Sequence, residues 1–366
     1  MSVLYMLAVI GALLLAQVAL LGRFALRAVT YSRSFSRAAA FAGDTVELRE
    51  VLRNKKPLPL PWLMAESRMS PHLQFGGAIA DGALHETADA YHRSVFFLAP
   101  FSQVTRTQAV RLLRRGRYHV GSVSLTSGDL FGLALTSKQI ETGAAISVYP
   151  RLLSPAEMDI PSSRWQGDLL VRRWIVPDPF LVAGIREWRH GDAERDVHWA
   201  ATARTGFLQV KARDYTATPK LLVILNVQME ERQWGDLMAY EQDTVEHGLS
   251  LAATVCLRAL QGGLEAGFAA NAPMDGAEGT TVLFPARYAG RDLDILEAMA
   301  RLRILRTRNF FTFLADLGQL TGTDILILSA YDSLLIQERM AMLRLHGNSV
   351  ALWRLENAGI AKAGEG

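Results

Sequence analysis

The chain has 366 residues, of which 50% are hydrophobic and 20% are charged. At about 150 residues per domain, this length predicts two domains, and the balanced composition excludes a disordered chain, collagen and a coiled coil. The net charge of +3 is too small for the concentrated basic face of a nucleic-acid-binding protein, so no nucleic-acid partner is predicted. The single cysteine, Cys256, excludes an intrachain disulfide and a zinc site built on several thiolates.

The N-terminal segment is a candidate membrane span. Residues 3–22 form an apolar run in which Gln17 is the only strongly polar side chain, and about 20 such residues suffice to cross the hydrocarbon core. No basic residue precedes the run, and it is longer than the apolar region of a usual signal peptide, which favours an anchor over a cleaved signal. The basic residues that follow it are Arg23, Arg27, Arg33 and Arg37. This asymmetry predicts a single-pass protein of the inner (cytoplasmic) membrane whose C-terminal body is cytoplasmic.

Residues 34–150 have the pattern of an all-β domain. Apolar and polar side chains alternate with period two at 46–49 and again at 146–149, and turn signals such as Gly43-Asp44 separate the runs. No long segment of helical period intervenes. The pattern favours an Ig-like β-sandwich.

After Lys220 the pattern changes to strands and helices in alternation. Strands are predicted at 221–227, 264–270, 324–329 and 349–355, a hairpin-like segment at 281–284, and helices at 245–260, 293–302, 311–320 and 334–345. Short apolar strands alternating with helices are typical of an open, doubly wound α/β sheet. Cys256 lies on the inner stripe of the first of these helices, and we interpret it as a core residue rather than a nucleophile.

The junction between the two parts, residues 151–219, carries the most distinctive local pattern. Gly191-Asp192 is a turn signal whose aspartate can cap a helix over 193–204, Gly206 is a C-terminal stop, and 207–211 resumes an alternating strand.

A chemical interpretation of the same stretch is a hydrolase or metal site. Its candidate groups are His190, Asp192, Asp196 and His198. We favour the structural interpretation, because Asp192 acts as a cap, Asp196 and His198 face different sides of a short helix, and no hydrolase or phosphate-loop motif occurs. The protein is predicted not to be an enzyme, with no catalytic residue and no cofactor.

The positions Gly191, Asp192, Arg195, Val197, His198, Trp199, Thr202, Ala203 and Arg204 resemble the signature of the bacterial family called domain of unknown function 58. Residues 115–121 and 128–133 look like the family's upstream sandwich strands, and Asn54 with 59–62 looks like its Pro-rich loop. The resemblance implies a membrane-anchored protein with a β-domain and a von Willebrand factor A-like domain. It also implies a MoxR-type AAA+ ATPase as a partner.

Related A domains bind Mg²⁺ after their first strand through Asp-x-Ser-x-Ser. In this chain Asn226, Gln228 and Glu230 occupy the three ligand positions, so the first has lost its charge and the second is too long for the same geometry. Ala330 stands where many such domains have a second aspartate, although Glu230 and Asp332 remain as nearby carboxylates. We predict a degenerate metal-ion-dependent adhesion site (MIDAS) without a bound metal.

These observations predict five segments: a membrane anchor with its basic flank at 1–30, a β-sandwich at 34–150, the junction at 151–219, the A-like domain at 220–356 and a flexible tail at 357–366. The predicted function is that of a non-enzymatic membrane-anchored adaptor or scaffold. Its A-like domain would work with a cytoplasmic MoxR-type ATPase, in the assembly or maturation of protein complexes. The alternative is an extracytoplasmic or envelope protein-binding module, which the arginine flank argues against.

Overall fold

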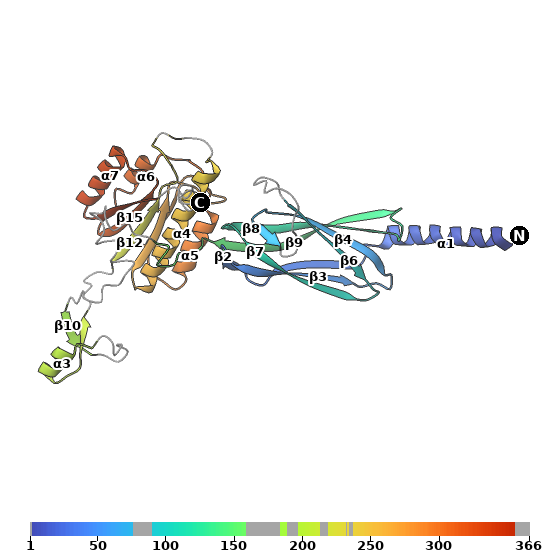
Figure 1. The fold of residues 1–366 in the computed structure, drawn as a ribbon, viewed down its shortest axis with the longest axis horizontal. Coiled ribbons are helices and arrows are strands. Elements are labelled where there is room, and N and C mark those ends of the chain that lie inside the picture. Colours follow the sequence, from blue (N-terminus) through green and yellow to red (C-terminus); the bar gives the residue numbers. More distant parts are fainter. Residues whose placement is uncertain are drawn as a thin grey trace, which may run out of the picture. The chain divides into compact units, whose positions relative to one another are not determined.

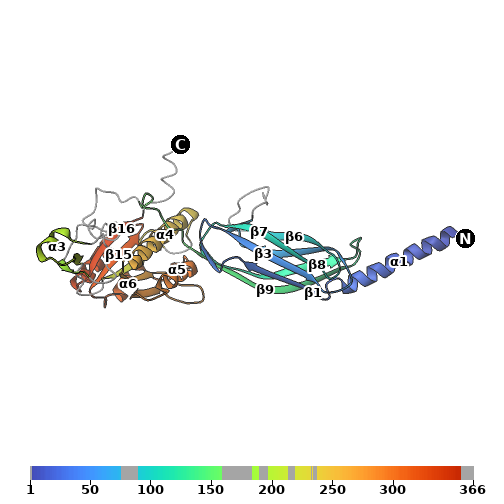
Figure 2. The same ribbon diagram turned by 90° about the horizontal axis from the view of Figure 1, so that it is seen from below.

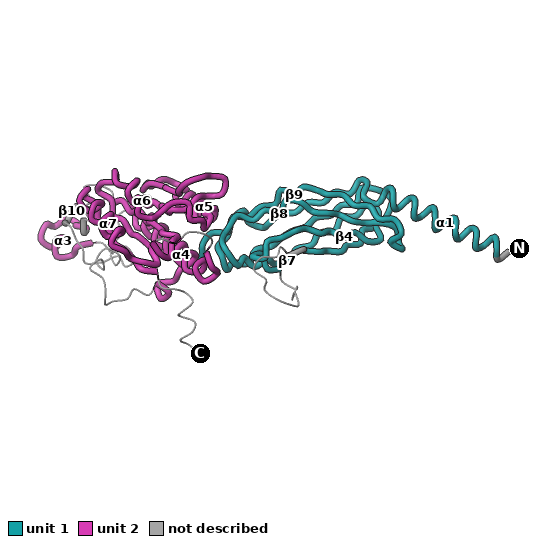
Figure 3. Tube along the Cα trace, turned by 90° about the horizontal axis from the view of Figure 1, so that it is seen from above, with its two compact units in different colours: residues 1–151 teal, residues 152–366 magenta. Residues whose placement is uncertain are grey.

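The computed structural model describes residues 2–75, 90–158, 184–188, 197–212, 219–231, 233 and 237–355. The chain forms two compact units, residues 1–151 and residues 152–366 (Figure 3). The division falls at the end of the predicted β-domain. The expected tail at 357–366 lies outside the described residues.

The first unit begins with the helix α1 (Ser2–Phe24). Its segment Leu4–Phe24 is long and apolar enough to span a membrane, and no other helix among the described residues meets that criterion. A signal sequence would have the same length and composition. Only 6% of the most apolar window is buried, whereas the core helix of a soluble protein would be mostly buried.

Two β-sheets follow α1 and pack into a sandwich (Figures 1 and 2). One sheet has the order β1-β3-β7-β5 and the other the order β2-β9-β8-β4-β6. The strands are β1 (Val29–Phe35), β2 (Ala39–Phe41), β3 (Thr45–Asn54), β4 (Leu60–Met69), β5 (Leu73–Phe75), β6 (Ala90–Leu98), β7 (Gln103–Leu112), β8 (Gly116–Gly128) and β9 (Leu135–Tyr149). The predicted alternation is seen in β3, whose side chains alternate between buried and exposed along most of the strand.

The sandwich begins at Val29, earlier than the predicted boundary at residue 34, and this changes the role of one arginine. Arg33, predicted to belong to the basic flank of the membrane span, lies inside the sandwich, directly opposite Glu50 in the β1–β3 register. Both side chains are fully buried, and their ion pair is 2.7 Å long. Arg33 also donates to Ser67 Oγ at 2.6 Å, and Tyr31 Oη donates to Glu50 Oε1 at 2.5 Å.

This polar group divides the sandwich core in two. On the side of α1, the core includes Ala25, Leu26, Leu52 and Leu98. At the other end a separate apolar cluster contains Leu48, Leu112 and Val148. The residues that directly follow α1 are thus part of the sandwich core rather than a free linker.

The second unit is built on a five-stranded sheet with the order β14-β13-β12-β15-β16. Four strands are parallel, and β14 pairs with β13 in the antiparallel sense. The strands are β12 (Lys220–Leu225), β13 (Glu265–Ala270), β14 (Thr281–Ala286), β15 (Thr323–Ser329) and β16 (Ser349–Arg354), and the helices are α4 (Ala239–Gln261), α5 (Arg291–Arg301), α6 (Phe310–Asp316) and α7 (Leu334–Leu345).

Helices cover both faces of this sheet (Figure 1). Helices α6 and α7 pack their apolar residues, among them Phe313 and Met340, against Leu222 and Ile327 of the sheet. Helix α4 covers the opposite face, where Cys256 is fully buried and contacts Gly267 O. The expected alternation is confirmed element by element, and Cys256 is a core residue as predicted.

Several boundaries differ from the sequence prediction, and two of them lie at candidate site residues. Strand β12 ends at Leu225, so that Asn226 already belongs to the following loop. In the junction the described helix is α3 (Trp199–Thr205), which begins within the predicted 193–204 because Val197 is extended and bridges Val210; residues 193–196 lie outside the described residues. The strands β10 (Gly184–Glu187) and β11 (Gln209–Ala212) form an antiparallel hairpin beside it, of which only the second was predicted.

Candidate functional site

The candidate site lies at the edge of the sheet where the parallel strands have their carboxyl ends. Strand β12 is central, with β13 on one side and β15 on the other. The connection from β12 to β13 and the connection that leads into β15 therefore run over opposite faces of the sheet. In open α/β sheets this switch point creates a crevice outside the carboxyl ends of the strands. The residues at that edge are Asn226 after β12, Asn271 after β13 and Ser329 at the end of β15.

These three polar side chains are fully buried and bonded to one another. Asn226 Nδ2 donates to Ser329 Oγ at 3.0 Å, and Asn271 Nδ2 donates to Asn226 Oδ1 at 3.3 Å. The same Asn226 oxygen accepts the backbone N–H of Gln228 at 3.0 Å, and Asn271 Oδ1 accepts that of Val227 at 2.9 Å. The network therefore fixes the loop that follows β12.

Gln228 extends this network to the start of α6. Its Oε1 accepts the backbone N–H of Phe310 at 2.8 Å, and its Nε2 donates to Asn309 Oδ1 at 3.2 Å. The side chain is fully buried. The Gln228 side chain is too long to replace a serine ligand of a metal, but the same length allows it to reach α6.

The donors and acceptors of this edge are thus engaged within the protein. An amide oxygen has two lone pairs, and both acceptor positions of Asn226 Oδ1 are taken by protein N–H groups. Glu230 and Asp332 are exposed and do not join the network; Asp332 instead accepts two hydrogen bonds from Gln337 at 2.8 and 2.9 Å. Among the described residues no cluster of three or more His, Cys, Asp or Glu side chains could hold a metal ion. That the site holds no metal stays a prediction, for which this bonding gives a physical reason.

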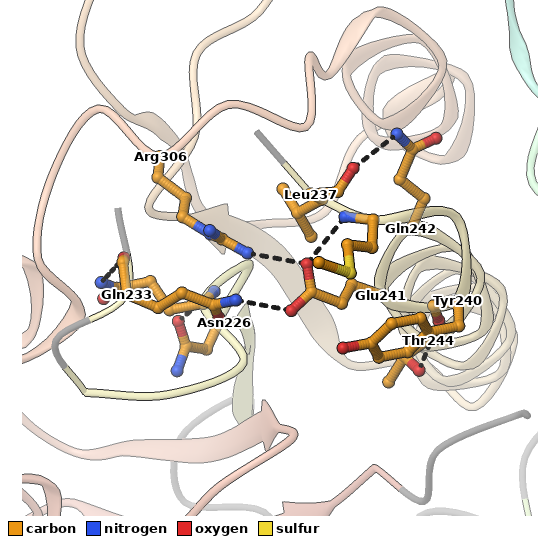
Figure 4. Close-up of polar contacts among 10 residues, drawn as sticks. Asn226, Gln233, Leu237, Tyr240, Glu241, Gln242, Thr244 and Arg306 are labelled. Atoms are coloured by element: carbon orange, nitrogen blue, oxygen red, sulfur yellow. Dashed lines mark hydrogen bonds and ion pairs between the residues drawn. The ribbon is translucent and has the colours of Figure 1, made fainter. Parts of the chain in front are cut away.

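A buried ion pair lies next to this edge (Figure 4). Glu241, in the first turn of α4, faces Arg306 at 3.3 Å, and both side chains are at most 3% exposed. Glu241 also accepts the Gln233 side chain at 2.6 Å and the backbone N–H of Met238 at 2.8 Å. One carboxylate therefore connects the loop after β12, the start of α4 and the loop before α6.

The pKa of Glu241 is shifted by opposing causes. Burial raises it, but the hydrogen bonds from Gln233 and from the Met238 backbone, together with the nearby Arg306 charge, lower it by more. The net shift is below the ordinary value, so the charged form is favoured. A depressed pKa in a fully engaged carboxylate suits a structural role better than proton transfer.

The junction motif is described only in part. Gly191, Asp192 and Arg195, as well as His190 and Asp196, lie outside the described residues. The cap of the helix is His198, whose Nδ1 accepts the Ala201 backbone N–H at 3.1 Å, so the cap predicted for Asp192 is taken by a residue farther along the chain. Gly206 has φ of 76° and ends the helix as predicted.

The described motif residues on α3 form an exposed surface. Trp199 is 70% exposed, Ala203 and Arg204 are exposed, and α3 has no buried residue. Phe207, directly after the helix, is 69% exposed. We call Trp199, Ala203, Arg204 and Phe207 the α3 surface.

The sequence analysis identified Asn226 and Gln228 but not the residues to which they are hydrogen-bonded. Asn271 and Ser329 carry a usable signal, because each is a polar residue at the carboxyl end of an apolar parallel strand. Glu241 and Arg306 carry none, since the two residues are distant in the sequence and only the packing of α4 brings them together.

No protein-family profile matches the chain. The uncharacterized protein YeaD of Bacillus subtilis (strain 168) is 24% identical over 254 residues, which cover 68% of this chain but only 58% of the length of YeaD.

Among solved structures, the CARDB domain of the PF1109 protein from Pyrococcus furiosus matches with a TM-score of 0.21 and 11% identity, over 33% of this chain and 92% of that domain. The ASH/PapD-like domain of human CEP192 matches with a TM-score of 0.20 and 13% identity, over 33% of this chain and 84% of that domain.

Proposed function

We propose that the protein is a non-enzymatic membrane-anchored adaptor. In this proposal helix α1 tethers the protein, the β-sandwich forms the membrane-proximal body, and the α/β unit is a von Willebrand factor A-like domain that serves as a protein-binding module. The proposed partner is a cytoplasmic MoxR-type AAA+ ATPase, which the resemblance to the domain of unknown function 58 family implies. The opposite orientation, with an envelope partner, is the alternative outcome of the test below.

The observation that carries this proposal is the α3 surface. Three described residues of the motif that carries the resemblance, Trp199, Ala203 and Arg204, are exposed on one short helix, whereas Val197 before it is buried. Exposed tryptophan and arginine are the residue types that most often dominate the binding energy of protein interfaces. The closed amide network at the carboxyl edge also supports binding by surface contacts, because its polar atoms already bond to the protein.

The experiment is in-cell crosslinking of the tagged full-length chain, followed by detergent extraction and identification of the captured proteins. Capture of a MoxR-type ATPase by the wild-type chain is the expected result. Trp199→Ala should reduce that capture by about tenfold or more, in line with the loss of an interface hot spot. Because Trp199 is mostly exposed, the variant should keep the wild-type melting temperature.

The matched control is Phe284→Ala, which removes an aromatic side chain that is 58% exposed on the edge strand β14 of the same unit. It should leave capture unchanged. Equal capture by Trp199→Ala and the wild type would remove the α3 surface from the proposal. Capture of envelope proteins alone would reverse the orientation and replace the ATPase as partner.

A further inference from the structure

The loop that joins β8 to β9 carries an unusual group of exposed apolar side chains. Leu130, Phe131 and Leu133 are 61%, 64% and 77% exposed, and Leu135, at the start of β9, is 65% exposed. We call residues 129–135 the hairpin tip. Contiguous exposed apolar residues of this size on a soluble surface mark an interaction site.

The hairpin tip is an ordered structure rather than a loose loop. The buried Asp129 accepts the backbone N–H groups of Phe131 at 3.0 Å and Ala134 at 2.7 Å. Trp62 donates its indole N–H to the Asp129 backbone oxygen at 2.9 Å. The carboxylate therefore holds the backbone in a fixed turn, and the apolar side chains are directed outward.

The hairpin tip lies against the last turns of α1. The Thr136 hydroxyl donates to the Gly22 backbone oxygen, and a Cβ placed on Gly22 would lie 2.7 Å from the Cβ of Ala134. Figures 1 and 2 show that β8 and β9 run along the sandwich and that α1 leaves from one end of it. This contact sets the position of the hairpin tip along the helix axis.

That position is the membrane surface if α1 spans the bilayer. A segment of 21 residues from Leu4 to Phe24 is about 30 Å long as a helix, which matches the hydrocarbon core. Gly22 then lies near the boundary between hydrocarbon and headgroups. The exposed side chains of the hairpin tip, fixed beside Gly22, lie at the same depth.

The loop between β6 and β7 also lies at the membrane-facing end of the sandwich. Phe101, between β6 and β7, is 71% exposed and has φ of 49°, a conformation that is uncommon for an aromatic residue. Its backbone N–H donates to Lys56 O at 3.2 Å. Lys56 in turn donates from Nζ to the backbone oxygens of Ala25 and Arg27, directly after the end of α1.

The polar surroundings fit a lipid headgroup region. A groove of about 490 Å³ at the end of α1 is lined by Leu20, Phe24, Pro57 and Leu58 as well as by Arg27 and Lys56. Arg23 and Arg27 are exposed beside it. Apolar residues bordered by basic ones are the composition of segments that bind at the surface of anionic membranes.

We infer that the hairpin tip and Phe101 insert into the headgroup boundary of the bilayer crossed by α1, so that the β-sandwich docks directly on the membrane surface. The inference depends on the membrane anchor of the proposed function. It adds a second membrane contact, which holds the sandwich upright at the surface instead of leaving it on a flexible tether.

The test uses the full-length chain in vesicles that contain anionic phospholipid. An environment-sensitive fluorophore is attached to Phe131→Cys or Leu133→Cys in a Cys256→Ala background, and to Ala109→Cys as the control. Ala109 is exposed on β7 and pairs with Glu47, toward the other end of the sandwich. Both tip probes should show blue-shifted emission and quenching by spin-labelled lipid, and the control probe should show neither.

Co-flotation of the protein with the vesicles distinguishes failure of the docking inference from failure of the proposed membrane anchor. If the protein floats but the tip probes are quenched by aqueous iodide as strongly as the control, the docking inference is wrong and the anchor stands. If the full-length chain does not float, the anchor fails and the docking inference fails with it. Retained melting temperature of each cysteine variant shows that the fold is intact.

Discussion

The structural role of Arg33 depends on the residue with which it is paired. In the sequence it is one of four arginines after an apolar run, which is the pattern of a basic flank. In the fold it is a fully buried strand residue, paired with Glu50 and stacked on the Tyr31 ring at 5.3 Å.

The Arg33–Glu50 pair gives a stability prediction. Glu50→Gln should lower the free energy of unfolding by about 3 kcal/mol, because the guanidinium stays buried without the carboxylate that it contacts. The double variant Arg33→Met/Glu50→Leu should lose much less, since both charges are removed together. Denaturant unfolding of the full chain in detergent measures both values. A double variant as unstable as Glu50→Gln would show that the pair is stabilising by itself.

Glu241 gives a pH prediction. Its pKa in the fold lies below the ordinary value of 4.5, so the stability it contributes is fully present above pH 4.5 and is lost as the pH falls through the lowered pKa. The unfolding free energy should therefore decrease as the pH falls from 4.5 through that lowered pKa, and Glu241→Gln should reduce that dependence. The exposed Glu338→Gln on α7 is the control, and it should follow the wild-type curve. Parallel curves for wild type and Glu241→Gln would contradict this role.

At the scale of elements, periodicity identified the helices and strands but not what ends them. Helix α7 has the predicted bounds, because Ser333 caps it and accepts the Ile336 N–H. Helix α3 begins late because Val197 is held in a bridge to Val210 and His198 provides the cap. Residues 128–133 were expected to resemble a sandwich strand, but β8 ends at Gly128 and the hairpin tip follows it. The contact of this region with α1 depends on residues more than 100 positions apart.

Asp129 gives a prediction at this scale. The Ala134 N–H, followed by smaller contributions from neighbouring N–H groups, lowers the pKa of the Asp129 carboxyl against the opposing effect of burial. Asp129→Ala should therefore open the hairpin tip and speed hydrogen exchange at Phe131 and Ala134. The wild-type hairpin tip should loosen in the same way as the pH falls through the lowered pKa of Asp129.

Hydrogen-exchange mass spectrometry measures this effect, with Asp44→Ala as the control. Asp44 accepts the Phe41 N–H at 3.0 Å in another turn of the same sandwich. Its replacement should change exchange only near residue 41. Unchanged exchange at 131–134 in Asp129→Ala would show that the strands alone hold the hairpin tip.

At the scale of the whole molecule, the side of the membrane on which the body lies decides between the proposed partners. The chain offers a clean assay, because its one cysteine, Cys256, is fully buried and burial raises its pKa to about 12. A cytoplasmic body predicts that Glu230→Cys reacts with a membrane-impermeant maleimide only after permeabilisation. Ser2→Cys, before the span, should react in intact cells. The reverse pattern would place the body outside and favour the envelope-binding alternative.

The sequence by itself determined the apolar N-terminal span, the change from period-two strands to alternating strands and helices, and the position of Asn226 and Gln228 after a buried strand. Each of these depends on residues that are close along the chain, so local pattern is sufficient. Only the tertiary structure decided that Arg33 is buried, that Glu241 meets Arg306, that amides close the carboxyl edge, and that the hairpin tip lies beside Gly22. The physical reason is that burial and pairing are set by partners distant in sequence, which strand register and helix packing bring together.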